Sequence, residues 1–229
     1  MTHLPASGPA RAVGPCRIAR LALGLGLVAG AAIVAATSPS PGQSADVLLE
    51  CSSCHGSGQA LPGRQSTMQT PFPDLDGQPA RYLDRQLDAF RLGLRKHRQM
   101  QSTATALGEG GAPAMARLYA DAPAGQWQAP ASDELNENGR ALALEGAWER
   151  GVPPCASCHG PSAQQSGRLA PVLYGQDAAY LAHELRRYAN GERRSDTMGR
   201  MRAYAGQLSQ SEIQAVADYY GAWTAKQEQ

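Results

Sequence analysis

The sequence has few cysteines, almost no net charge and no strand-like patterning. Four of its five cysteines fall in two short motifs, so no pair is left over for a structural disulfide. The formal net charge is +1, and after residue 45 acidic residues outnumber basic ones by two. This balance gives no indication of nucleic-acid binding and predicts at most modest electrostatic attraction to a partner. Because no segment sustains polar–apolar alternation, we expect an all-α chain.

Long hydrophobic runs are also absent, apart from one near the N-terminus. Arg11, Arg17 and Arg20 precede residues 21–36, which are sixteen residues without a charge, and a stretch rich in small and polar residues follows. This order is typical of a secretory signal, so we expect residues 1–45 to be a signal peptide with a polar exit. Export would place the protein in the periplasm. The alternative is an uncleaved N-terminal anchor, in which residues 21–36 attach the protein to the inner membrane.

One pentapeptide pattern occurs twice. Residues 51–55 read Cys-Ser-Ser-Cys-His, and residues 155–159 read Cys-Ala-Ser-Cys-His. Such a run is the attachment site of a c-type haem, in which two thiols form thioethers to the porphyrin and the histidine binds the iron. A thioredoxin-like dithiol or half of a zinc site would use the cysteines but leave the adjacent histidine without a role. We therefore expect two covalently bound haem c groups. The thioether residues are Cys51, Cys54, Cys155 and Cys158, and the iron-binding histidines are His55 and His159.

The residues after each motif repeat at a constant offset of 98. A Pro-x-Leu-x-Gly-Gln turn, a Tyr-Leu pair and a Gly-x-Arg sequence occur in both halves. The matched residues are Pro73, Leu75, Gly77, Gln78, Tyr82, Leu83, Gly93 and Arg95 in the first half, and Pro171, Leu173, Gly175, Gln176, Tyr180, Leu181, Gly191 and Arg193 in the second. We expect a first domain at residues 46–120, a Pro/Ala/Gly-rich linker at 121–132 and a second domain at 133–229.

Each repeat is expected to contain a helix after its turn and another at its end. In the first repeat, Leu83, Leu87, Phe90 and Leu94 are spaced as one apolar helix face requires. In the second, residues 209–212 form a capping-box pattern before the closing helix. The corresponding segment of the first repeat is rich in glycine, so its last helix is expected to begin later.

Two methionines are candidates for the sixth position on iron. Met100 and Met201 occupy equivalent positions at an offset of 101, about forty residues after each histidine. A methionine sulfur raises the reduction potential, whereas an open position would admit peroxide or oxygen. Met198 is an alternative to Met201, and His97 is an alternative to Met100, although its basic neighbours favour a solvated face.

The turn prolines are expected to help orient the iron-binding histidines. A backbone carbonyl at Pro73 and at Pro171 can accept the Nδ1–H of the histidine in the same repeat. Such a bond would fix the orientation of the ring.

Taken together, these motifs make residues 46–225 similar to the dihaem cytochrome c4 family. The resemblance implies two tandem class I cytochrome c domains, each a small helical fold around one haem with His/Met ligands. It implies an electron carrier rather than an enzyme, passing single electrons from a respiratory donor to an acceptor such as a terminal oxidase. Its partners would be redox proteins, including membrane respiratory complexes. The alternatives are a cytochrome subunit of a periplasmic dehydrogenase and, less in keeping with the duplicated methionine, a dihaem peroxidase.

Overall fold

The computed structural model describes residues 51–55, 72–123, 127–131, 136–160 and 169–225. All of them belong to one compact unit. The expected signal segment, residues 1–45, lies outside the described residues. Among the helices in the described ranges, none is long and apolar enough to cross a bilayer.

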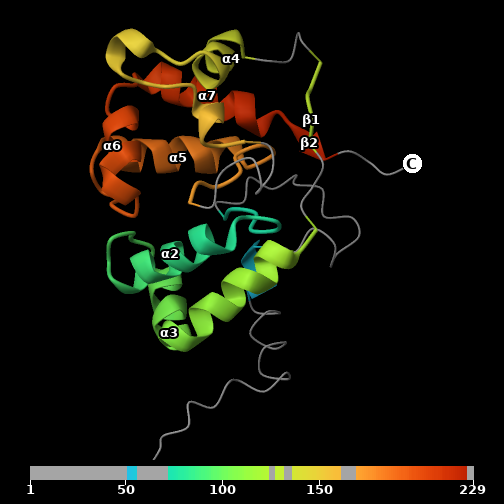
Figure 1. Cartoon of the computed structure of the whole chain (residues 1–229), viewed down its shortest axis with the longest axis vertical. Coiled ribbons are helices and arrows are strands. Elements are labelled where there is room, and N and C mark those ends of the chain that lie inside the picture. The colour runs from blue at the N-terminus through green and yellow to red at the C-terminus, as the bar shows by residue number, and fades with distance from the viewer. Residues whose placement is uncertain (1–50, 56–71, 124–126, 132–135, 161–168, 226–229) are drawn as a thin grey trace, which may run out of the picture. The chain divides into compact units, whose positions relative to one another are not determined.

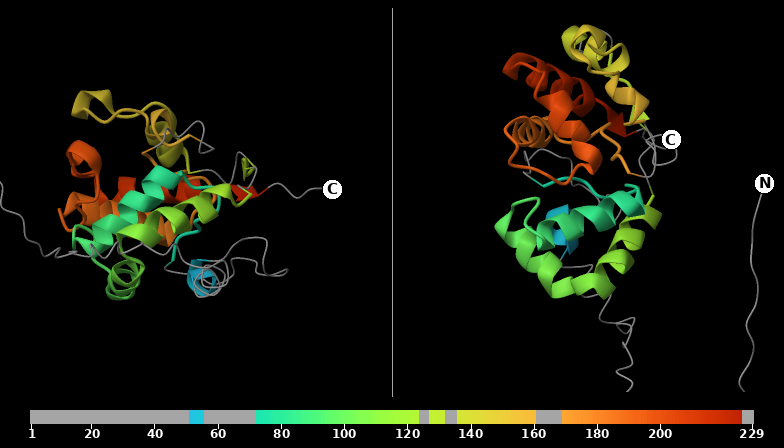
Figure 2. Two further views of the ribbon diagram at one scale, coloured as in Figure 1. Left: turned by 60° about the horizontal axis from the view of Figure 1, so that its bottom comes forward. Right: turned by 60° about the vertical axis from the view of Figure 1, so that its left-hand side comes forward.

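The first repeat is built from two packed helices and the helical turn that carries the first motif. Residues 51–55 are helical, α2 spans Ala80–Arg91 and α3 spans Arg98–Asp121. α2 and α3 lie side by side (Figures 1 and 2). Their shared core contains Tyr82 and Leu83 from α2 and Ala116 and Tyr119 from α3, and Cys51 packs against it. The first motif is therefore held against the helix pair.

The second repeat has more helices and a larger core. Its helices are α4 (Glu137–Leu144), α5 (Ala178–Ala189), α6 (Arg200–Ala205) and α7 (Gln210–Gly221), with short 3₁₀ turns η2 (Trp148–Arg150), η3 (Cys155–Ser157) and η4 (Thr197–Gly199). α7 packs against both α4 and α5. Its Ile213 is fully buried, and the capping box predicted for its start is confirmed: Ser209 and Glu212 bond to each other's backbone N–H groups.

The segment expected to be a linker contains a short strand. β1 (Trp127–Gln128) pairs antiparallel with β2 (Thr224–Ala225), with Trp127 opposite Ala225. The ring of Trp127 lies against Gly175, at a place where any side chain would collide with it. This part of the linker is therefore fixed to the second repeat, in an otherwise helical fold.

Two local expectations for the first repeat were wrong. α2 ends at Arg91, and Gly93 then adopts a positive φ of 71°, so Leu94 lies outside the helix and is 43% exposed rather than on the apolar face. The closing helix does not begin late either. Helical backbone resumes directly after Gly108, whose φ of 63° kinks α3 at the position that Ser209 caps in the second repeat. In the first repeat Gly108 therefore breaks the helix at the position where the Ser209 cap begins a new helix in the second repeat.

The two repeats meet through a symmetric set of hydrogen bonds. The Gln78 amide donates to the Val172 carbonyl at 3.0 Å and accepts from its N–H at 2.9 Å. The Gln176 amide makes the same pair of bonds to Asp74, at 2.6 and 3.1 Å. The glutamines are equivalent residues of the two repeats, as are their partners. The repeated Pro-x-Leu-x-Gly-Gln turn therefore joins the halves as well as shaping each of them.

Candidate haem sites

The two motif histidines have matching surroundings. His55 Nδ1–H donates to the Pro73 carbonyl at 2.9 Å, and His159 Nδ1–H donates to the Pro171 carbonyl at 2.8 Å. The predicted contact between turn and histidine is thus confirmed in both repeats. Burial lowers the pKa of both imidazoles, which are 8% exposed. A neutral ring with Nδ1–H engaged leaves the Nε2 lone pair free to bind a metal.

The candidate sulfur of the first site lies close to its histidine. Met100 is near the start of α3, and its Sδ is 3.5 Å from His55 Nε2. The structure thus brings together a nitrogen and a sulfur that lie 45 residues apart in the sequence. These two atom types are the axial pair of a His/Met haem.

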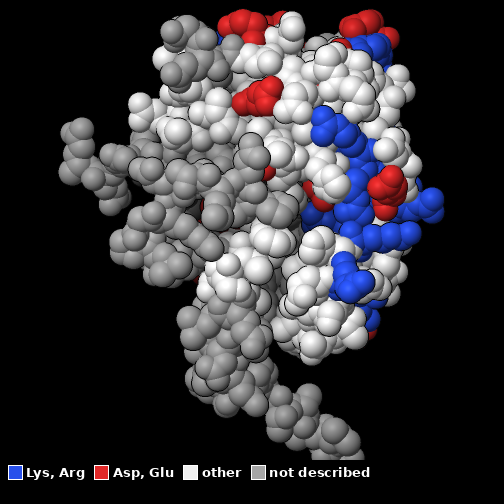
Figure 3. All heavy atoms as spheres, turned by 180° about the vertical axis from the view of Figure 1, so that it is seen from behind, with Lys and Arg blue, Asp and Glu red and all other residues white. Residues whose placement is uncertain are grey.

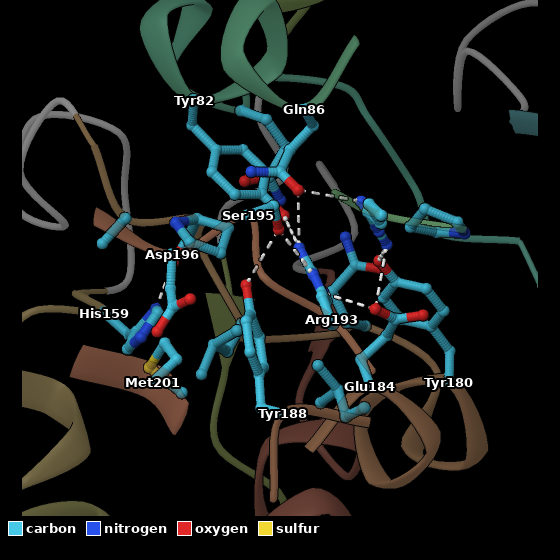
Figure 4. A pocket seen from close by; sticks show the side chains of 18 of the residues that line it. Tyr82, Gln86, His159, Tyr180, Glu184, Tyr188, Arg193, Ser195, Asp196 and Met201 are labelled. Carbon is cyan, nitrogen blue, oxygen red and sulfur yellow. Dashed lines mark hydrogen bonds and ion pairs between the residues drawn. The ribbon is translucent and has the colours of Figure 1, made fainter. Parts of the chain in front are cut away.

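In the second site, Met201 and Met198 differ clearly in position. Both methionines border the cavity that contains His159, but Met201 is partly buried on α6 and lies near that histidine (Figure 4). Met198 is 82% exposed, and its sulfur lies 3.8 Å from the Arg200 guanidinium. Met201 is therefore the better-placed sulfur.

His97 has a structural role at the start of α3. It is exposed, and its Nδ1 accepts the Met100 N–H at 3.3 Å as the N-cap of the helix. Its ring also contacts the edge of Phe72, which in turn contacts His55. His97 thus positions the segment that carries Met100.

The environment of Cys155 does not suit a thioredoxin-like dithiol. Cys155 is partly buried, with Sγ 3.5 Å from the Leu142 carbonyl, and burial raises its pKa to about 11. A thioredoxin-like dithiol needs the opposite shift, because the thiolate is the reactive form. In the described part of the chain, no group of three His, Cys, Asp or Glu side chains could hold a metal ion.

One cavity contains both motifs. Its volume is about 1070 Å³, larger than the roughly 300–1,000 Å³ of a typical pocket for one small ligand. Its wall includes all four motif cysteines, both motif histidines, Met100 and Met201, together with apolar side chains such as Leu83, Phe90, Leu181 and Val216. An apolar wall with thiols on one side and a histidine facing a sulfur suits a flat, largely apolar macrocycle that binds iron.

Charged side chains from both repeats meet at this cavity (Figure 4). The Glu184 carboxylate lies 2.6 Å from Arg193 Nη1 and 3.2 Å from Arg95 Nη2. Burial opposes ionisation of Glu184, but the adjacent Arg95 and Arg193 outweigh it and lower its pKa. Each arginine also reaches the tyrosine of the other repeat: Arg95 donates to Tyr180 at 2.8 Å and Arg193 to Tyr82 at 3.3 Å.

This network leaves donors that a haem could use. Among the described residues, the buried Arg95 Nε and Gln86 Nε2 have no hydrogen-bond partner, and one carboxylate faces two buried guanidiniums. Such a surplus of donors and positive charge suits a group that carries carboxylates, as haem does through its propionates. The residues present therefore fit the cofactor that the motifs predict. When bound, haem iron supplies reversible one-electron chemistry, and the chain holds and orients it.

Sequence reasoning did not identify this network, although its signal was present. Tyr82, Gln86 and Arg95 recur as Tyr180, Glu184 and Arg193 at the same offset of 98. Repetition of polar residues on a predicted helix and in the loop after it indicates a shared buried role.

Comparison with known proteins identifies the family. Residues 141–219 match the family described as cytochrome c oxidase, cbb3-type, subunit III. A thiosulfate dehydrogenase electron acceptor from Stutzerimonas stutzeri (strain A1501) is 39% identical over 176 residues, which cover 75% of this chain and 78% of the relative. A cytochrome c4 from Thiocapsa roseopersicina is 33% identical over 171 residues, covering 74% of this chain and 84% of the relative.

A solved structure is similar as well. Thiosulfate dehydrogenase (TsdBA) from Marichromatium purpuratum is 34% identical with a TM-score of 0.63, and the match covers 76% of this chain and 36% of that one. This chain therefore spans about a third of that longer protein.

The fold and the two sites define an electron-transfer c-type cytochrome built from two class I domains in tandem. The chain belongs to the dihaem cytochrome c4 family. Membership confirms the expected fold class and the two covalent haem c groups.

Proposed function

We propose that this protein is a periplasmic carrier of single electrons whose two haems both have closed His/Met coordination, and that it catalyses no substrate reaction of its own. The observation that carries the proposal is that each motif histidine has a methionine near it: the Met100 sulfur is 3.5 Å from His55 Nε2, and Met201 lies near His159 in the cavity. Two strong axial ligands leave no iron position for peroxide or oxygen. This argues against the dihaem peroxidase alternative.

The ligand assignment follows the motifs. Thioethers form at Cys51, Cys54, Cys155 and Cys158, and the axial ligands are His55 with Met100 and His159 with Met201. The domains run over residues 46–120 and 133–229, with residues 121–132 between them. The chain reaches the periplasm through residues 1–45, and residues 21–36 remain as a membrane attachment only if the signal is not cleaved.

For the electron donor, we propose a periplasmic dehydrogenase that oxidises thiosulfate. Two similarities support this choice. A relative that is 39% identical bears the name thiosulfate dehydrogenase electron acceptor, and this chain is similar to part of a solved thiosulfate dehydrogenase structure. The acceptor is a membrane respiratory complex such as a terminal oxidase. The alternative is a cytochrome subunit that stays bound to the dehydrogenase, which copurification with a larger dehydrogenase subunit would indicate.

Paired methionine variants test the coordination. Met201→Ala is expected to remove the sulfur-to-iron(III) absorption band of one haem and lower its reduction potential, because sulfur ligation favours ferrous iron. Met198→Ala is the matched control and is expected to change neither property, because that side chain is 82% exposed. The reverse pattern would assign the ligand to Met198.

Stopped-flow mixing with a purified thiosulfate dehydrogenase and thiosulfate tests the donor. We expect reduction of both haems within the turnover time of the dehydrogenase. Failure of that reaction, with rapid reduction by ascorbate retained, would reject this donor. Added peroxide is expected to be turned over no faster than by free haem, and rapid turnover would instead support a peroxidase.

A further inference from the structure

Two equivalent loops lie together where the repeats meet. Residues 92–97 follow α2, and residues 190–195 follow α5 at the same offset of 98. The Arg194 N–H donates to the Leu94 carbonyl at 2.7 Å, which joins the loops directly. Side chains at their tips therefore form one surface contributed by both repeats.

This surface carries positive charge that the described part of the chain does not neutralise. Lys96 and Arg194 lie in these loops, Arg98 begins α3 directly after the first loop, and Arg200 begins α6 five residues after the second. All four are exposed, and none of them forms an ion pair with another described residue. A band of Lys and Arg side chains with few acidic ones among them is visible from behind (Figure 3). The near-neutral composition thus conceals a strongly uneven charge distribution.

The acidic residues of these segments already have other partners. Glu192 is exposed and lies 3.8 Å from Arg187, Asp196 pairs with Arg202, and Asp88 and Glu109 share Arg91. Counted against these arginines, the carboxylates leave the four unpaired cations as a surplus of positive charge. The surplus is a property of the local fold rather than of the composition.

Two leucines are exposed beside these cations. Leu92 is 60% exposed and Leu94 is 43% exposed, and both lie in the loop that carries Lys96. Residue 192, the equivalent of Leu94, is a glutamate, so the second repeat does not need an apolar side chain at this point of the fold. Apolar side chains within a charged rim are the usual composition of a protein interface. We call Leu92, Leu94, Lys96, Arg98, Arg194 and Arg200 the junction patch.

The junction patch lies directly outside the charge network of the haem cavity. The same two loops supply Arg95 and Arg193, which are buried and line that cavity. His55 and His159 line the same cavity. Lys96 directly follows Arg95, and Arg194 directly follows Arg193. A partner bound at the patch would therefore lie close to the residues that border both haem sites.

We propose that the junction patch is the docking surface for an acidic face of a redox partner protein. Uncompensated cations would attract and orient the partner, and the two leucines would supply the apolar centre of the contact. This inference rests on the proposed function, because it adds to it the surface chemistry of the electron donor. Steering of this kind speeds association by about tenfold to a thousandfold and weakens steeply as ionic strength rises.

Charge reversal tests the surface. Lys96→Glu and Arg194→Glu, made singly and together in the dihaem protein, are compared with Arg140→Glu, which makes the same charge change at an exposed position on α4. The first readout is the rate of reduction by thiosulfate dehydrogenase against ionic strength. The second is adsorption and voltammetry on a gold electrode coated with a carboxylate-terminated monolayer, which needs no protein partner.

We expect the double variant to be reduced at least about tenfold more slowly at low salt and to lose its salt dependence. It should also lose retention on the carboxylate monolayer, while Arg140→Glu behaves as wild type in both measurements. Leu92→Ser should raise the half-saturating concentration of cytochrome without changing the salt dependence. Reduction by ascorbate is expected to be the same in all variants, which confirms intact haems.

Equal effects of Arg140→Glu and of the loop variants would overturn the proposal, because net charge alone would then be acting. Unchanged reduction of the double variant by a dehydrogenase that does reduce the wild type would also overturn it, while leaving the proposed function intact. A wild type that the dehydrogenase cannot reduce would reject the donor, and the monolayer would still test the patch. Loss of binding to phosphatidylglycerol vesicles, with no change in reduction by the dehydrogenase, would instead identify a membrane-binding surface.

Discussion

Replacing Glu184 by glutamine tests the buried charge network most sharply. The carboxylate is the shared counter-ion of two buried guanidiniums, with oxygen–nitrogen distances of 2.6 Å to Arg193 and 3.2 Å to Arg95. Removing one partner of a buried ion pair typically costs about 3–5 kcal/mol, because the remaining charge keeps its desolvation penalty. Because haem propionates would neutralise part of the same positive charge, we expect Glu184→Gln to lower the free energy of unfolding of the holoprotein by up to that amount near neutral pH.

Unfolding of the ferric holoprotein in guanidinium chloride measures this change in free energy directly. Glu192→Gln is the control, because its carboxylate is 58% exposed and lies 3.8 Å from Arg187; such surface pairs contribute about 0–1 kcal/mol. The effect of Glu184→Gln should also shrink in acid. Since the folded-state pKa of Glu184 is lowered, its contribution is complete above the unfolded pKa of about 4.3 and is lost as pH falls through the folded value. Equal losses in the two variants, or an effect independent of pH, would refute the reasoning.

Two further predictions concern packing and a surface ion pair in the second repeat. Gly139→Ala should lower the free energy of unfolding by at least about 2 kcal/mol, because its Cβ would lie 2.0 Å from the Ala215 carbonyl oxygen. Gly110→Ala is the control: its Cβ would have no neighbour within 4 Å, so the free energy of unfolding should change by no more than about 1 kcal/mol. Similar values for both variants would contradict this packing. Arg150→Met should raise the pKa of Glu212, which the paired guanidinium and the Ser209 backbone N–H hold at about 2, toward its ordinary value in an NMR titration of the reduced protein. A titration still centred near 2 would show that Arg150 is not the cause.

The sequence was most informative where the two repeats confirm each other. The motif histidines, the turn prolines and the capping box at Ser209 each have short-range signals, and the structure places them as expected. A pattern that recurs at a fixed offset is independent support for each of its copies. Helix periodicity likewise located α2 and α5.

The remaining features depend on contacts that no local pattern specifies. Leu94 fits a helical spacing, but the positive φ at Gly93 ends the helix first and turns the side chain outward. The short β1–β2 pairing joins segments about a hundred residues apart, with too few residues for a strand signal. The same applies to the charge network, since it exists only because the repeats pack against each other.

Net charge is likewise a limited predictor of electrostatic steering. Composition predicts weak steering because it sums over the chain, while a partner responds to the local field. A band of Lys and Arg side chains on one face shows that charge is unevenly distributed even in a nearly neutral protein (Figure 3).

The central claim, that two haems each have a histidine and a methionine ligand, is tested most directly by a spectroelectrochemical titration of the mature protein. We expect two one-electron steps, with the sulfur-to-iron(III) band of the fully oxidised protein accounting for two haems and disappearing in step with both reductions. A single one-electron step, or a band equivalent to only one haem with a high-spin second iron, would contradict the account.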